Sequence, residues 1–206
     1  MQDSGGDRGT DWGQLYRDHV AAVTELARRL TPEELSAFVP GTPEWSVRDV
    51  LAHLAGGPAD TVSGRTEGAP GPEWTARHVV ERRGRSVLDL TAELARNQEA
   101  VVASLLEDVK RAPVVYDIAT HLADLHEALG LDRPAERYWQ PVVDAIAQSR
   151  AAELVDRVAP YELFRAAFSR RSRTQLRAWG TGLADEVLDR IGVFGPRDDD
   201  QPTPKG

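Results

Sequence analysis

Residues 113–130 read PVVYDIATHLADLHEALG and carry the clearest structural signal in the chain. Apolar residues recur at helical spacing, proline opens the segment and glycine closes it, which is typical of one complete α-helix. At about 100° per residue, Asp117, His121 and Asp124 fall along one edge of the apolar stripe. Side chains at that edge can point into a cleft between helices, whereas His126 lies away from it.

Helical patterns also run through the rest of the chain. Thr31-Pro32-Glu33-Glu34 is a capping-box pattern, and Ser46 is placed to cap a helix that meets its first strong breaker at Gly56-Gly57-Pro58. We expect helices at 11–30, after Thr31, from Ser46, after the glycine- and proline-rich loop 64–72, and at 86–110, 113–129, 138–158, 161–168, 174–179 and 183–191. No segment of useful length alternates with period two, so the sequence predicts an all-α fold. A bundle fills about the first 130 residues, and a smaller helical part follows.

Composition limits the classes of function. The 206 residues are 41% hydrophobic and 28% charged, within the range of soluble globular proteins. The net charge of −8 argues against a general nucleic-acid-binding surface, because phosphate contacts need clustered cations. Apolar runs are too short to span a bilayer, and the first residues show no secretory signal. We therefore expect a cytoplasmic protein without nucleic-acid or membrane partners.

The chain contains no cysteine. This excludes disulfides, cysteine-rich zinc sites and a cysteine nucleophile. Any thiol chemistry must therefore use a thiol that a cofactor or substrate brings in.

His53, on an earlier predicted helix, is a candidate partner for Asp117 and His121. One carboxylate and two imidazoles on two helices can form a three-ligand metal site with coordination positions left open for chemistry. Asp49 and Asp124 are candidates for orienting these ligands through hydrogen bonds. The spacing alone also fits a solvated pair or a satisfied contact in the core.

Three other aromatic or histidine side chains have simpler interpretations. His19 and His78 stand in charged surroundings, so we expect both at the surface. Trp45 follows a proline- and glycine-rich loop, where tryptophan most often anchors the packing of the next helix.

Two segments together resemble a known family. GTPEWSVRDVLAHLAG at 41–56 resembles the tryptophan-to-histidine motif of the mycothiol-dependent maleylpyruvate isomerase family, and DIATHLADLHEALG at 117–130 resembles its second motif. That family belongs with the DinB-like metal-binding four-helix bundles. The resemblance implies a DinB-like metal-binding bundle over 11–135 and a helical C-terminal region over 136–194. The remaining residues, 1–10 and 195–206, are expected to be flexible tails.

The resemblance also implies a site and a chemistry. The family's metal ligands fall on His53, Asp117 and His121, which implies a divalent ion, with zinc as the expected metal. The first acidic ligand of the family is commonly glutamate, so the shorter Asp117 predicts closer helices or a contact through water. The implied cofactor is mycothiol or a similar thiol, and the implied reaction is isomerisation or S-transfer on a small electrophile.

A cationic stretch near the C-terminus offers a group for an acidic substrate. Arginines cluster within residues 165–177, and the segment around Arg170 and Arg171 weakly resembles a C-terminal family pattern in which glycine usually stands where this chain has Ser169. We predict that an arginine of this stretch clamps an anionic group, with Arg170 and Arg171 as the catalytic candidates. The alternative is a solvated cationic face.

Other functions fit the same sequence. The bundle could bind a metal, a small ligand or a protein without catalysis, or it could hydrolyse a substrate with Asp124 or Asp49 as base to a metal-bound water. Bundles with a C-terminal appendage can dimerise, so a homodimer is a candidate assembly.

Overall fold

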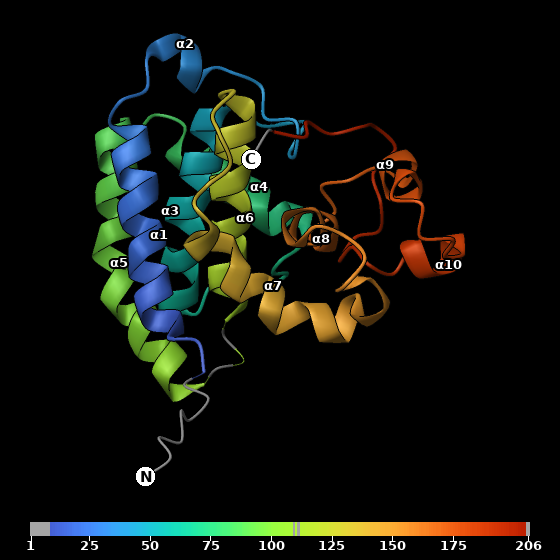
Figure 1. Ribbon diagram of the computed structural model, residues 1–206. Coiled ribbons are helices and arrows are strands. Elements are labelled where there is room, and N and C mark those ends of the chain that lie inside the picture. Colours follow the sequence, from blue (N-terminus) through green and yellow to red (C-terminus); the bar gives the residue numbers. More distant parts are fainter. Residues whose placement is uncertain (1–8, 109, 111, 205–206) are drawn as a thin grey trace.

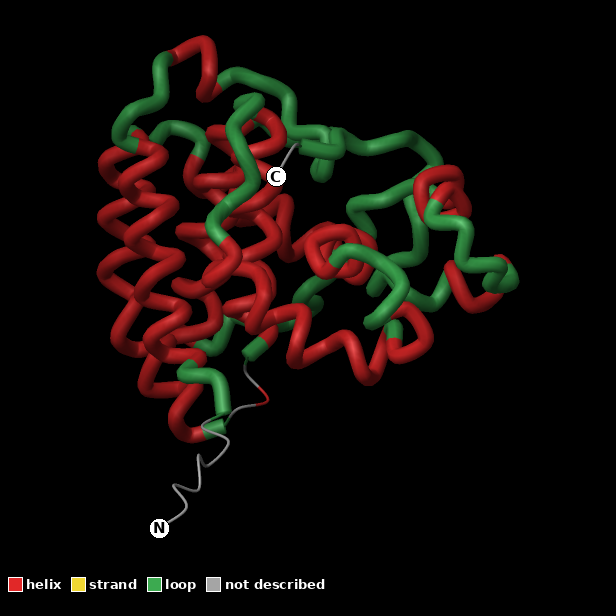
Figure 2. The backbone as a smooth tube through the Cα atoms, in the orientation of Figure 1, coloured by secondary structure: helices red, strands yellow, loops and turns green. Residues whose placement is uncertain are grey.

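The computed structural model describes residues 9–108, 110 and 112–204, and these residues fold into helices connected by loops (Figures 1 and 2). Two isolated bridges, Phe38 with Ser46 and Ser172 with Arg197, are the only β pairing within the described ranges. The predicted all-α class is therefore confirmed.

Four long helices form a bundle on one side of the molecule (Figure 1). Helices α3 and α1 each pack against both α5 and α6, so the four enclose one apolar core. The bounds of these helices are α1 (Trp12–Ala27), α3 (Val47–Ser63), α5 (Val87–Glu107) and α6 (Pro113–Ala128). The core that they share buries side chains such as Tyr16, Val20, Leu51, Leu54, Leu94, Leu122 and Leu125. This arrangement agrees with a DinB-like helical bundle.

Two shorter helices lie in the connections of the bundle. Helix α2 (Pro32–Leu35) begins with the capping box that Thr31 predicts, and α4 (Pro72–Arg82) packs along α3. The cap of α3 is also as predicted, since the Ser46 hydroxyl accepts the backbone N–H of Asp49. Local sequence therefore sets where α2 and α3 begin.

The predicted break at Gly56-Gly57-Pro58 is wrong, because α3 runs through these residues to Ser63. The helix ends only before Gly64, whose positive φ of 77° suits glycine. A Cβ at position 56 would lie 2.6 Å from the Cβ of His78. Gly56 thus permits the close approach of α4, and tertiary packing outweighs the local breaker signal.

In the C-terminal region, α8 and α9 lie within one residue of the predicted helices, but two other helices are shorter than the sequence predicts. Helix α7 packs on α6 and carries α8, which attaches this region to the bundle. The bounds are α7 (Glu136–Arg150), the 3-10 helix η2 (Ala152–Leu154), α8 (Pro160–Ala167), α9 (Arg173–Ala178) and α10 (Asp185–Leu188). The helix predicted at 138–158 therefore ends early, and the one predicted at 183–191 shrinks to a single turn.

The chain after Gly195 packs against this region, in contrast to the expected free tail. The backbone N–H of Arg197 donates to Arg171 O at 3.0 Å, and Gln201 is only 4% exposed. Backbone pairing and burial therefore fix residues that look polar and turn-rich in sequence. The expected tail at 1–10 falls largely on residues 1–8, outside the described residues.

No helix among the described residues is both long and apolar enough to cross a membrane.

His19 on α1 is fully buried, which corrects the surface placement predicted for it. Its ring lies 5.2 Å from that of Tyr138 on α7, and its Nδ1 is 2.7 Å from Leu15 O. Burial lowers the pKa of His19 to about 4, against the smaller opposing effect of backbone hydrogen bonds. His19 therefore stays neutral in the folded protein at pH values where it binds a proton in the unfolded chain, whose histidine pKa is about 6.5.

We expect this difference to reduce stability as the pH falls from about 6.5 to about 4, because the unfolded state binds more protons across that window. Substituting His19→Phe should make the free energy of unfolding fall less steeply there, by at most about 3 kcal/mol in total. Denaturant unfolding at a series of pH values measures this. Parallel profiles for the two proteins would contradict it.

Candidate metal centre

Three side chains from two helices converge inside the bundle. His53 comes from α3, and Asp117 and His121 come from successive turns of α6. Their ligand atoms all lie within 4.8 Å of one another. His53 Nε2 is 3.3 Å from Asp117 Oδ2, and His121 Nε2 is 3.6 Å from Asp117 Oδ1. The structure thus brings together the three residues that the sequence singles out.

The donor set and its spacing fit a divalent transition metal. Zinc–nitrogen and zinc–oxygen bonds of about 2.0–2.2 Å at a tetrahedral ion place neighbouring donor atoms about 3.3 Å apart. The distances from the Asp117 carboxylate to the two imidazoles match that value closely. Asp117 therefore reaches both histidines despite its short side chain, because α3 and α6 pack directly against each other.

The centre is buried on the histidine side and open on the carboxylate side. His53 and His121 are 2% and 5% exposed, whereas the side chain of Asp117 is 44% exposed. The ring of Trp45 lies 5.0 Å from that of His53 and 6.1 Å from that of His121. Trp45 thus packs against both histidines as well as preceding α3, and approach from solvent is possible beside Asp117.

Neighbouring side chains lower the pKa of the Asp117 carboxyl. Partial burial raises its pKa, but His53 and His121 more than compensate and, together with Arg170, hold it below the usual range. The carboxylate is therefore ionised near neutral pH, as a metal ligand must be.

Asp124 lies behind His121, fully buried. Its Oδ2 is 3.0 Å from His121 Nδ1, although the direction departs from that of a good hydrogen bond. Arg165 Nη2 donates to Oδ1 at 2.6 Å, and Arg170 Nη2 donates to Oδ2 at 2.8 Å. Burial raises the pKa of Asp124, but Arg170 and Arg165 hold it well below its usual range. Asp124 is thus close enough to His121 to orient it, but its predicted hydrogen bond to this ring is not formed here, so the orienting role stays a prediction.

Asp49 does not take the corresponding place beside His53. Its carboxylate accepts the backbone N–H and the hydroxyl of Ser46 at 3.0 and 2.7 Å, which completes the capping box of α3. The prediction that Asp49 orients a ligand is therefore wrong, because helix capping engages its side chain.

Comparison with known proteins finds a family that matches part of the bundle. A family model described as the mycothiol maleylpyruvate isomerase N-terminal domain matches residues 16–116. This match supports membership of that family for residues 16–116. The match includes His53 and ends one residue before Asp117, so two of the three converging residues lie just beyond it. No curated protein and no solved structure matches the chain.

Two further residues beside the centre escaped the sequence analysis. His78 is fully buried, not at the surface as predicted, and its Nδ1 lies 3.1 Å from His53 Nδ1. Tyr16 is also fully buried; burial and the charge of Asp117 raise the pKa of its hydroxyl, which has no hydrogen-bond partner among the described residues. The four-residue spacing of Trp74 and His78, which places both on one face of α4, is a signal that could have revealed the buried face.

The two predicted catalytic arginines lie in different surroundings. Arg171 is fully buried and donates two hydrogen bonds to Glu162 at 2.6 and 2.8 Å. The Arg170 side chain is 11% exposed, and its charge lowers the pKa of Asp117 from beside Asp124. Of the two, Arg170 is the one that acts electrostatically on the centre.

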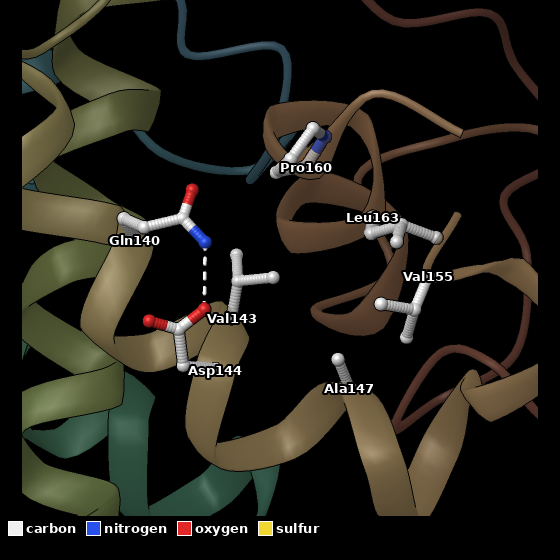
Figure 3. A pocket seen from close by; sticks show the side chains of 7 residues that line it. All are labelled: Gln140, Val143, Asp144, Ala147, Val155, Pro160 and Leu163. Carbon is white, nitrogen blue, oxygen red and sulfur yellow. Dashed lines mark hydrogen bonds between the residues drawn. The ribbon is translucent and has the colours of Figure 1, made fainter. Parts of the chain in front are cut away.

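A cavity of about 180 Å³ lies elsewhere, between α7, α8 and the segment after η2 (Figure 3). Apolar side chains such as Val143, Val155 and Leu163 line it, next to the hydrogen-bonded pair Gln140 and Asp144. None of its lining residues belongs to the candidate metal centre. The cavity is therefore separate from the site described above.

Arg165 joins the centre to the C-terminal region, since it binds Asp124 and also Glu127 at 2.7 Å while being fully buried itself. We expect Arg165→Met to lower the free energy of unfolding by about 3 to 5 kcal/mol, because two buried carboxylates each lose a cationic partner. Urea denaturation measures the loss. Arg177→Met, which removes an exposed pair with Asp185, is the control and should change little. Similar small losses in both variants would contradict the expectation.

Proposed function

We propose that the protein is a metal-dependent enzyme that uses a low-molecular-weight thiol, mycothiol or one similar to it, for isomerisation or S-transfer on a small electrophilic substrate. The observation that carries this proposal is the convergence of His53, Asp117 and His121 within 4.8 Å. The name of the family, mycothiol maleylpyruvate isomerase N-terminal domain, supports the thiol and the class of reaction. We place the activity in the cytoplasm, in line with the sequence-based expectation.

The three converging residues would hold the metal, and zinc suits a set of two imidazoles and one carboxylate. A divalent ion bound there favours the ionised form of a nearby thiol. Because the chain has no cysteine, that thiol must come from a cofactor. The exposed side of Asp117 gives the cofactor a route, while Trp45 shields the histidines.

We propose Arg170 as the cation that meets an anionic group of the substrate. Its side chain is 11% exposed, and its guanidinium is fixed because Asp124 accepts hydrogen bonds from Nε and Nη2 while Phe168 O accepts one from Nη1. Arg171 supports this role less directly, because its buried pair with Glu162 holds the segment in place. In this proposal residues 11–135 supply the metal ligands and residues 136–194 supply the anion-binding arginine.

Hydrolysis by a metal-bound water is a weaker alternative. It needs a carboxylate base, and the arginines beside Asp124 hold the pKa of that carboxyl well below its usual range, which makes it a poor base. Asp49 is engaged in the capping box. A bundle that binds metal or ligand without catalysis remains the main competitor, and a homodimer remains a prediction.

Metal binding is tested first. We expect the metal-free protein to bind one divalent ion per chain in calorimetric titration with zinc or nickel. His121→Ala should weaken binding by more than about 100-fold, because losing a ligand costs more than losing one of its outer partners. His126→Ala, on the same helix but outside the converging group, should bind as the unmodified protein does. No uptake of either metal by the unmodified protein would remove the basis of the proposal.

Substitutions of Asp117 give a second test of metal binding. Asp117→Asn should lower zinc affinity strongly, since a neutral amide is a much poorer ligand for zinc than a carboxylate. Asp117→Glu should retain binding, because glutamate is the common family residue at this position. Equal affinity in Asp117→Asn and the unmodified protein would show that Asp117 is not a ligand.

Catalysis is tested with the zinc-loaded protein. We expect mycothiol-dependent isomerisation of maleylpyruvate, or mycothiol conjugation to a small electrophile, at a rate that His121→Ala abolishes. Product analysis by mass spectrometry distinguishes the two reactions. Zinc binding without any thiol-dependent turnover would favour the non-catalytic bundle, and turnover without thiol would favour hydrolysis.

A further inference from the structure

The ring of His53 is held at both nitrogens. Nε2 faces the Asp117 carboxylate at 3.3 Å, and Nδ1 lies 3.1 Å from Nδ1 of His78. The first contact belongs to the candidate metal centre. The second links this centre to a buried group on α4 that the proposed function does not use.

The contact continues beyond His78 to a buried carboxylate. His78 Nε2 lies 3.2 Å from Asp60 Oδ2, and the two residues are 0% and 1% exposed. Asp60 follows His53 by seven residues on α3, so both lie on the same helix face, two turns apart. Arg77 donates to Asp60 Oδ2 at 2.5 Å, and Arg65 lies 3.6 Å from Oδ1. These two cations keep the carboxylate ionised.

The position of each proton follows from this arrangement. An ionised Asp60 only accepts, so Nε2 of His78 carries the proton between them. A fully buried imidazole is most stable when neutral, which leaves Nδ1 of His78 as an acceptor. Only one proton fits between the two Nδ1 atoms, so it belongs to His53. The lone pair of His53 is then on Nε2 when a divalent ion lies between this atom and the Asp117 carboxylate.

Gly56 makes this contact possible. A Cβ at position 56 would lie 2.6 Å from both Cβ and Cγ of His78 and 2.8 Å from Nη1 of Arg82. A Cβ on the neighbouring Gly57 would meet only Trp74, at an ordinary 3.6 Å, and His78 Cε1 at 3.9 Å. The side chain of His78 therefore occupies the space that a larger residue at position 56 would fill.

Two further contacts hold His78 in place. The ring of Trp74 lies edge-on at 4.2 Å from that of His78. Arg82, at the end of α4, donates two hydrogen bonds to Glu93 on α5, at 2.7 and 3.0 Å, and both side chains are buried. Helix α4 thus packs against α3 and is joined to α5 by this ion pair, which fixes the position of His78.

We propose that His78 and Asp60 form a positioning relay that keeps His53 in the Nδ1-protonated tautomer and thereby sets the affinity of the centre for a divalent ion. This proposal rests on the metal binding in the proposed function. His78 and Asp60 act through His53, since metal-ligating histidines depend on a partner at the other ring nitrogen for tautomer and orientation.

Zinc titration of the metal-free full chain by calorimetry tests the relay, with thermal unfolding followed by circular dichroism in parallel. We expect His78→Leu, which removes the acceptor, to weaken zinc binding by about 10- to 100-fold. His78→Asn, whose amide oxygen can replace Nδ1 as acceptor, should recover most of that affinity. A merely structural role of His78 would move thermal stability without this difference between the two variants.

The glycine pair supplies an independent test if a variant of His78 does not fold. Gly56→Ala should displace His78 and weaken zinc binding, whereas Gly57→Ala should leave zinc binding unchanged. The two variants are matched, because each replaces a glycine by alanine inside α3.

The outcomes separate the two proposals. Zinc binding by the unmodified protein with equal affinity in His78→Leu, or equal affinity in Gly56→Ala and Gly57→Ala, overturns the relay and leaves the metal site standing. Failure of the unmodified protein to bind zinc or nickel overturns both.

Discussion

The pairing of buried Asp124 with Arg165 and Arg170 is the interaction on which the arrangement of this protein depends. A carboxylate with no exposed surface is tolerated only when cations and hydrogen bonds compensate for the lost water. Because Asp124 is on α6 and both arginines follow α7, the compensation itself fastens the C-terminal region to the bundle. The same carboxylate stands behind His121. The ion pairs of Asp124 therefore attach the C-terminal region to the bundle, and the same carboxylate lies next to a candidate metal ligand.

The loop before α3 shares in this requirement. A Cβ at Gly41 would lie 2.5 Å from Asp124 Oδ1 and 3.2 Å from Arg170 Nε, so the loop backbone packs directly onto the ion pair. That loop leads to Trp45, whose ring packs against both histidines of the centre. Segments distant in sequence therefore meet around one buried charge.

Sequence patterns predicted what depends on neighbours along the chain. Four-residue spacing placed Asp117 and His121 on one face of α6, and the pattern at Ser46 located the start of α3. His78 and Gly56 were misjudged for a shared reason, since each has its meaning only when α4 lies against α3. A glycine that permits close approach and a glycine that ends a helix look the same in one sequence. Burial of a histidine flanked by charges depends likewise on which face of its helix meets a neighbour.

The unequal exposure of the three converging residues has a kinetic consequence. With both histidines buried and the Asp117 side chain partly open to solvent, an ion at this centre would be reached most directly from beside Asp117. A thiol or substrate that approached such an ion would meet it from the same side. A bound cofactor or substrate would therefore block the escape of the metal, and exchange with chelators would slow as the site fills. In the proposed function, the unequal exposure of the three side chains would thus link occupancy of the site to retention of its metal.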